Sequence, residues 1–180
     1  YKWFRDAVRQ ERRDQLRRDV IELVGHGVRD KSWGPRFWQS VWWYRWLPMA
    51  FGEDLGMTIS LVGAPDGSAK SGGWVWNGEG LEEIREVTVA SHYDDRGYQT
   101  NMRAVVRTDA RSFEVEGAVQ SLIPLRNRRT TPDGTALLTR ITEGCTRFVC
   151  DGRVGYGLSE YLDQIVDGVA VGRALDEVAS

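Results

Sequence analysis

The residues of this chain that could do acid–base chemistry gather in one short stretch, GHGVRDKSWGPRFWQSVWWYRW, which runs from Gly25 to Trp46. His26 and Asp30 lie there, close to five of the chain's eight tryptophans. If a strand over 20–28 continues to Asp30, both side chains point to the same face. An imidazole titrates near neutrality, and a carboxyl group buried in an apolar pocket has a raised pKa. The stretch therefore predicts Asp30 and His26 as catalytic residues that transfer protons.

The aromatic residues of the same stretch are candidate walls of a binding site. In an extended chain alternate residues share a face, so Trp38, Trp42 and Tyr44 fall on one side and Trp43 on the other. We expect one such set to line the interior of the fold. Aromatic walls with a few ionisable groups at the rim suit an apolar small molecule. The candidate ligand-binding residues are Lys31, Trp33, Trp38, Trp42, Tyr44, Tyr156 and Glu160.

Structural roles stay open for the ionisable residues of this set. Asp30 is also a turn former that can accept backbone hydrogen bonds or pair with a nearby cation. His26 also fits as a histidine in the wall of the fold. An inward-facing Glu160 needs a partner, and Arg103 and Arg147 are the arginines expected to supply it, unless the carboxylate contacts a ligand.

Short apolar and β-branched segments, separated by turn residues, must position these side chains. The expected strands are 20–28, 38–47, 55–63, 72–77, 83–91, 98–108, 112–123, 136–149 and 153–162. The turns between them carry Gly52, Gly67, Gly78, Gly97, Gly134 and Gly152. This pattern predicts an all-β antiparallel fold that closes into a barrel of eight or nine strands, because closure removes exposed strand edges.

The two ends of the chain are expected to lie outside the barrel. Residues 1–19 are rich in charge, and Asp14 and Arg18 have the i, i+4 spacing that supports a helix. They are therefore predicted to form a charged helix or a linker. The barrel domain is expected over 20–165, with a C-terminal tail over 166–180.

Composition argues against several classes of protein. The net charge of −2 gives no field that attracts nucleic acid, and no apolar run approaches the roughly 20 residues that span a bilayer. Cys145 and Cys150 lack the spacing of a zinc site and would point to opposite faces of one strand, so no disulfide is expected. This cysteine usage favours a reducing, cytoplasmic location. The glycine-rich loop over 63–73 does not fit the phosphate-loop pattern, and we expect neither a metal nor an organic cofactor.

Two motifs resemble those of a known superfamily. GHGVRDKSWGPRFW, residues 25–38, resembles the G-x-G-x-R-D-H-S-W-G-x-R-x-W signature of lipocalin-like (calycin) proteins of the carotenoid 1,2-hydratase/AttH-like superfamily. GRVGYGLSEYL, residues 152–162, resembles the G-x-G-x-x-E-Y ending of the same proteins, and the bacterial uncharacterised members are the most similar. The resemblance implies a lipocalin-like barrel and an apolar ligand such as an isoprenoid, a terpenoid or a polyketide-like molecule. It also implies that this chain is the C-terminal half of a pair, with a sister N-terminal lipocalin-like domain as its partner.

Three functions follow from these expectations. The first is an enzyme, a hydro-lyase or an isomerase, although Lys31 stands where the signature has histidine and favours the ionised form of Asp30. The second is a carrier or sensor of an apolar ligand. The third is a structural half that packs against its sister domain through aromatic side chains. A cavity lined by Trp38, Trp42 and Tyr44 would favour the first two, and a filled interior with exposed tryptophans on an outer flank would favour the third.

Overall fold

The computed structural model describes residues 2–14, 17–31, 33–34 and 37–173, with side chains from Gly25 onward within these ranges. The chain is all-β and antiparallel, as predicted, and the single turn of 3₁₀ helix η1 (Trp38–Ser40) is the one helical element in the part that is described. The strands are β1 (Lys2–Asp14), β2 (Arg17–Arg29), β3 (Trp43–Ala50), β4 (Gly56–Gly63), β5 (Ala69–Trp76), β6 (Leu81–Glu83), β7 (Glu86–Tyr93), β8 (Gln99–Arg107), β9 (Ser112–Thr130), β10 (Ala136–Cys150), β11 (Arg153–Val166) and β12 (Val169–Ala170).

One large sheet contains all of these strands except β1 and β2. Its hydrogen-bonded order is β6-β5-β4-β3-β11-β10-β9-β8-β7, and β12 pairs with β11. The sheet is not closed, so the barrel predicted from the turn pattern is not confirmed. The two residues that join its end strands, β6 and β7, each bond to a neighbouring strand: the Ile84 amide donates to the Gly73 carbonyl of β5 at 3.0 Å and the Arg85 amide to the Arg107 carbonyl of β8 at 2.8 Å.

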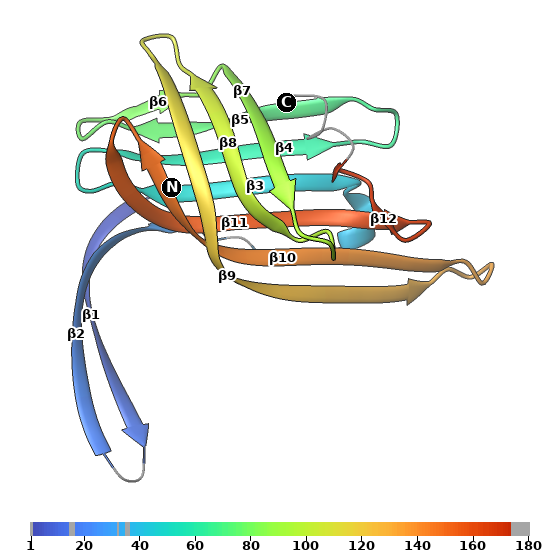
Figure 1. Ribbon diagram of the computed structural model, residues 1–180, viewed down its shortest axis with the longest axis horizontal. Helices are drawn as coiled ribbons and strands as arrows, with labels where there is room; N and C mark the ends of the chain where they lie inside the picture. Colours follow the sequence, from blue (N-terminus) through green and yellow to red (C-terminus); the bar gives the residue numbers. More distant parts are fainter. Residues whose placement is uncertain (1, 15–16, 32, 35–36, 174–180) are drawn as a thin grey trace.

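The open sheet curls so that one part covers the other. In Figure 1, β7, β8 and the first half of β9 cross over β3, β4 and β11. A register shift between Cys145 and Thr146, opposite Gln120 of β9, bends the long strands that take part in both layers. Apolar side chains from both layers fill the space between them. The core cluster is Leu47, Met49, Phe51, Leu55, Met57, Ile59, Val75, Ile84, Val87, Val89, Met102, Ala104, Val106, Phe113, Val115, Phe148, Cys150 and Tyr161.

The turns lie where glycine was expected to place them. Each of the six turn glycines of the prediction, Gly52, Gly67, Gly78, Gly97, Gly134 and Gly152, has a positive φ. That conformation is costly for residues with a Cβ, which explains why sequence located these boundaries well. Cys145 is exposed and Cys150 is buried, so the prediction that they point to opposite faces is also confirmed.

The two ends of the chain differ from the prediction. Lys2–Asp14 is not a helix but strand β1, paired along its whole length with β2 in a separate two-stranded hairpin that extends away from the large sheet (Figure 1). An i, i+4 charge pair contributes only a few tenths of a kcal/mol, which is little against a complete antiparallel ladder. Within the expected tail, Val169–Ala170 turns back to pair with Ile165 and Val166.

A buried ion pair fastens β3 to β11. Arg45 Nη2 lies 3.2 Å from Asp163 Oδ1, and both side chains are almost inaccessible to solvent. The Arg45 guanidinium also lies 4.3 Å from the ring centroid of Tyr161. The Gly172 amide donates to the same Asp163 oxygen at 2.9 Å, so the last described residues cover this pair. Removing one partner of such a pair would leave an uncompensated buried charge.

Candidate functional site

The side chains of β3 alternate between two faces of the sheet, and the sequence left open which of the two alternate sets is buried. Trp43, Arg45, Leu47 and Met49 are buried toward the core, so Tyr44 and the next even-numbered residues point away from it. The same holds on β11, where Tyr161 enters the core. An interior pocket lined by the even-numbered aromatic set, with Tyr156 and Glu160, is therefore not what the structure has. These residues lie on the outer face of the sheet.

The η1 segment makes a hollow on this outer face. Gln164 of β11 donates from Nε2 to the carbonyls of Trp38 and Val41, each at 2.7 Å, which holds the segment against the sheet. The hollow between them, here named the η1 depression, has a volume of about 510 Å³. Its lining residues are Phe37, Trp38, Ser40, Val41, Tyr44, Leu125, Ile141, Glu143, Glu160 and Leu162.

The η1 depression, at about 510 Å³, is large enough to hold a small organic molecule. That volume is within the range of roughly 300–1,000 Å³ that small-molecule sites occupy.

A pair of glutamates and a tyrosine stand among the apolar walls of the η1 depression. Glu143 of β10 lies directly opposite Glu160 of β11 in the ladder, and the Tyr44 hydroxyl donates to Glu160 Oε1. Partial burial, and then the charge of Glu160, raise the pKa of Glu143 above its ordinary value. A carboxyl group that holds its proton beside a carboxylate acceptor can donate and accept protons within one small site.

Sequence reasoning found Glu160 and Tyr44 but missed Glu143. The signal was present: a hairpin with Asp151 and Gly152 as its two turn residues pairs Cys150 with Arg153, and counting back along both strands places Glu143 opposite Glu160. The expected arginine partner of Glu160 is wrong, because the Tyr44 hydroxyl occupies that role. Arg103 instead pairs with Glu114 at 2.6 Å.

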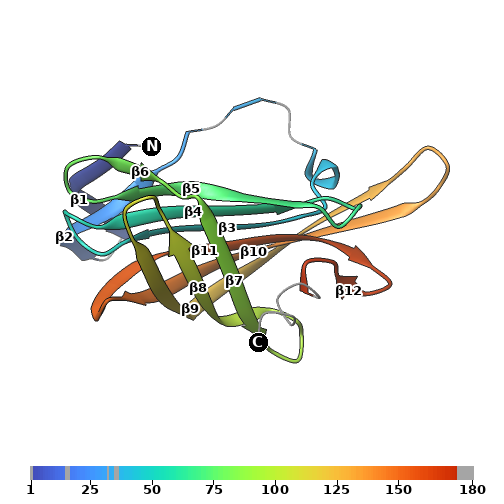
Figure 2. The same cartoon turned by 90° about the horizontal axis from the view of Figure 1, so that it is seen from above.

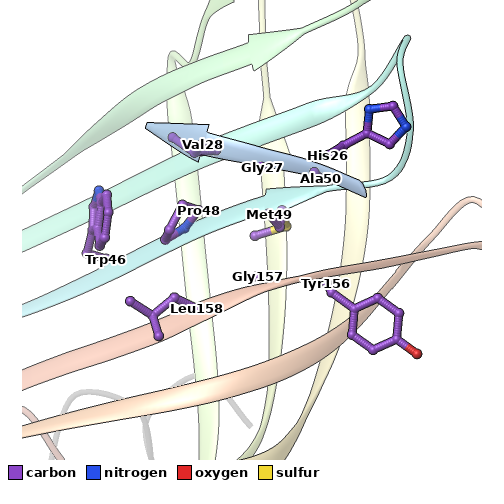
Figure 3. A pocket seen from close by; sticks show the side chains of 10 residues that line it. All are labelled: His26, Gly27, Val28, Trp46, Pro48, Met49, Ala50, Tyr156, Gly157 and Leu158. Carbon is purple, nitrogen blue, oxygen red and sulfur yellow. The ribbon is translucent and has the colours of Figure 1, made fainter. Parts of the chain in front are cut away.

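A second hollow, here named the β2 depression, lies where β2 passes over β3 and β11 (Figure 3). His26 and Tyr156 lie at one end of it, and Trp46 and Leu158 lie at the other. Its volume is about 340 Å³, and its lining contains no carboxylate. The lining residues are His26, Gly27, Val28, Trp46, Pro48, Met49, Ala50, Tyr156, Gly157 and Leu158.

The other predicted site residues line neither depression. Asp30 follows the end of β2, is exposed, and has no hydrogen-bond partner among the residues that the structure describes, so its expected interior position is wrong. Lys31 Nζ lies 5.3 Å from the ring centroid of Trp33, which is 82% exposed. Trp42 is half-buried, and its carbonyl accepts from the Gln164 amide at 3.0 Å. The η1 depression therefore unites Trp38, Tyr44 and Glu160, while His26 and Tyr156 belong to the β2 depression.

The described ranges contain neither a cluster of metal ligands nor a helix that could span a membrane. Within residues 2–14, 17–31, 33–34 and 37–173, no group of three or more His, Cys, Asp or Glu side chains could hold a metal ion. No helix in those ranges is long and apolar enough to cross a membrane.

Comparison with known proteins gives one match. A family model described as Domain of unknown function (DUF7064) matches residues 15–165. This range includes every residue that lines either depression. No curated protein and no solved structure matches the chain.

Proposed function

We propose, from the premise that the chain belongs to the family described as Domain of unknown function (DUF7064), that it binds an apolar small molecule in the η1 depression and transfers protons to and from it. The observation that carries the proposal is the Glu143–Glu160 pair, set among apolar walls, in which Glu160 accepts a hydrogen bond from the Tyr44 hydroxyl. Such a combination of apolar surface, few polar groups and a carboxyl group of raised pKa is typical of a small-molecule site.

The chemistry that suits this site needs no cofactor. Protonated Glu143 gives its proton to a carbon–carbon double bond, so that its O–H bond breaks and a C–H bond forms. The face of Trp38 stabilises the positive charge that develops on the second carbon. Water adds to that carbon and releases a proton to Glu160, which gives hydration, and the reverse sequence gives dehydration. Loss of a different proton from the cation gives isomerisation.

The resemblance to lipocalin-like proteins of the carotenoid 1,2-hydratase/AttH-like superfamily supports an apolar substrate such as an isoprenoid. In this proposal the large sheet is a lipocalin-like barrel that stays open between β6 and β7. The proton-transfer roles expected of Asp30 and His26 pass to the glutamate pair, since neither residue lines the η1 depression. His26 would contact a ligand only in the β2 depression.

A neutral apolar fluorophore, N-phenyl-1-naphthylamine, tests the binding step. We expect it to bind the wild-type protein saturably, and Trp38→Ala to weaken the binding at least tenfold, about 1.4 kcal/mol. Trp74→Ala is the matched control, because Trp74 is also partly exposed but does not line the η1 depression. Glu143→Gln should leave probe binding within about threefold and abolish turnover of a substrate identified by native mass spectrometry of the protein purified from its own host.

A second function is favoured by one observation, the row of exposed apolar side chains that continues beyond the η1 depression. Ile123 is 64% exposed and Tyr156 is 60% exposed, and both lie on the outer face. Such a surface suits docking against another folded domain, for which the resemblance suggests a sister lipocalin-like domain. Equal loss of probe binding in Trp38→Ala and Trp74→Ala, or binding that does not saturate, would favour this function over the first.

A further inference from the structure

Several arginines converge on the opposite face of β9 and β10, away from both depressions. Arg126 of β9 lies directly opposite Arg140 of β10. These strands form the hairpin that projects beyond the rest of the molecule in Figure 2. Like charges directly opposite in a ladder destabilise it, so this pairing needs a physical reason.

The turn between β7 and β8 lies against this pair. Arg126 Nη2 donates to the Tyr98 hydroxyl at 3.2 Å, and the Arg140 guanidinium lies 5.2 Å from the ring centroid of Tyr98. Arg96 approaches the same ring at 5.3 Å. A Cβ placed on Gly97 would lie 3.5 Å from Arg140 Nη1 and 3.7 Å from Arg173 Nη1, so a fourth guanidinium reaches the same turn.

Acidic groups do not balance this charge in the described part of the chain. Asp94 and Asp95 are the carboxylates of this turn. Asp94 pairs with Arg96 at 3.3 Å and accepts from the amides of Arg96 and Tyr98 at 2.9 Å. Arg126 and Arg140 have no carboxylate partner among the described residues. The cluster therefore has a net positive charge that an anion would offset.

An open cavity adjoins the cluster and gives a ligand access. It has a volume of about 340 Å³, and Arg96, Tyr98, Gln99, Leu122 and Pro124 are among the residues that line it. Leu122 and Pro124 precede Arg126 on the same face of β9, since alternate residues of a strand share a face. A ligand whose anionic group binds the arginines could therefore place the rest of the molecule in this cavity.

We propose that Arg126, Arg140 and Arg96 form a binding site for a phosphoryl group. Guanidinium groups match the oxygens of a phosphate through paired hydrogen bonds, and several of them suit a dianion better than a single carboxylate. Tyr98 and Gly97 position the arginines. This site is independent of the function proposed for the η1 depression. The phosphoryl group belongs either to a soluble compound or to a lipid headgroup.

Calorimetric titration with inorganic phosphate at constant ionic strength tests the site. We expect saturable binding to the wild-type protein, at least tenfold weaker binding in Arg126→Gln and Arg140→Gln, and an increase of wild-type melting temperature with phosphate. Arg126→Lys keeps the charge but loses the paired donors, and should also bind more weakly. Arg103→Gln is the control, because it removes the same charge from an arginine that is already paired with Glu114.

Vesicles distinguish the two sources. Binding to phosphatidylcholine vesicles that contain phosphatidic acid, lost in Arg126→Gln but not in Arg103→Gln, would assign the site to a lipid headgroup. Phosphate binding without vesicle binding would assign it to a soluble compound. Absence of saturable binding to both probes, or equal weakening by Arg103→Gln and Arg126→Gln, would overturn the proposal.

Discussion

Glu143 and Glu160 show how a cross-strand pair can set the chemistry of a single residue. Two carboxyl groups that face each other across a ladder repel when both are ionised. Burial adds to this effect for Glu143, whose pKa is raised. A pair of this kind lowers the stability of the fold at neutral pH. Its presence is therefore better explained by a functional role than by a contribution to stability.

The pH dependence of stability should reveal this pair. Because the pKa of Glu143 is raised in the folded state, its favourable contribution is present below the ordinary value of 4.5 and is lost as the pH rises above it. Glu143→Gln should therefore raise the melting temperature at pH 8 by roughly 1–3 °C, since solvent screens a pair on an open face. The gain should shrink as the pH falls toward 4, because Glu143 then takes up its proton.

Glu79→Gln provides the comparison for this measurement. Glu79 lies in an exposed turn, and its side chain has no ionic partner in the described part of the chain. Glu79→Gln should therefore leave the melting temperature unchanged at both pH values. An equal gain in the two variants, or a gain for Glu143→Gln that persists undiminished at pH 4, would remove the glutamate pair as its cause.

At the scale of elements, β3 and β11 approach each other unusually closely where the two strands pass Pro48. Their ladder pairs Gly157 with Met49 and Glu160 with Trp46, and it omits the residues between, where Pro48 has no amide to donate. A Cβ on Gly157 would overlap the Pro48 carbonyl. The glycine is therefore required by the backbone of the neighbouring strand.

Gly157→Ala should lower the free energy of unfolding by about 1–3 kcal/mol, as overpacked positions do. Gly72→Ala is the matched control in another strand of the same sheet, because no atom lies within 4 Å of a Cβ added there. It should change stability by less than about 1 kcal/mol and could increase it. Urea unfolding of both variants measures the difference. Similar effects in the two would contradict the close approach of β11 to β3.

The positions of the strands were largely predictable from the sequence, but which face of each strand is buried was not. Turn glycines and alternating apolar residues located 55–63, 98–108 and 136–149 to within a few residues of β4, β8 and β10. Periodicity tells which residues share a face, but both faces of β3 carry large aromatic residues, so it could not tell which face is buried. Glu143 was missed because its significance depends on a partner in the next strand.

At the scale of the whole molecule, the curled sheet leaves one of its two cysteines accessible to solvent and buries the other. Cys145 is exposed, whereas Cys150 lies in the core, where burial and then the charge of Asp151 raise its pKa to about 11. A thiol of that pKa is almost entirely protonated at pH 8 and so reacts slowly even when it is reached.

A thiol reagent at pH 8 should therefore label Cys145 rapidly and Cys150 only when the sheet opens. In Cys145→Ser, the labelling rate should rise with urea in parallel with global unfolding followed by tryptophan fluorescence. Cys150→Ser provides the comparison, since its remaining thiol should react at the same rate with and without urea. Rapid labelling of Cys145→Ser in the absence of denaturant would show that the two layers separate far below the unfolding transition.

The pairing of β3 with β11 also bears on how the chain is made. β3 occupies the middle of the sheet, yet β11, which completes its pairing, follows all the other long strands of that sheet along the chain. A nascent chain therefore leaves the ribosome with one side of β3 bare until Arg153–Val166 has emerged. Throughout that interval β3 can pair with a strand of a neighbouring chain, so contact with a chaperone would protect this protein most before β11 has emerged.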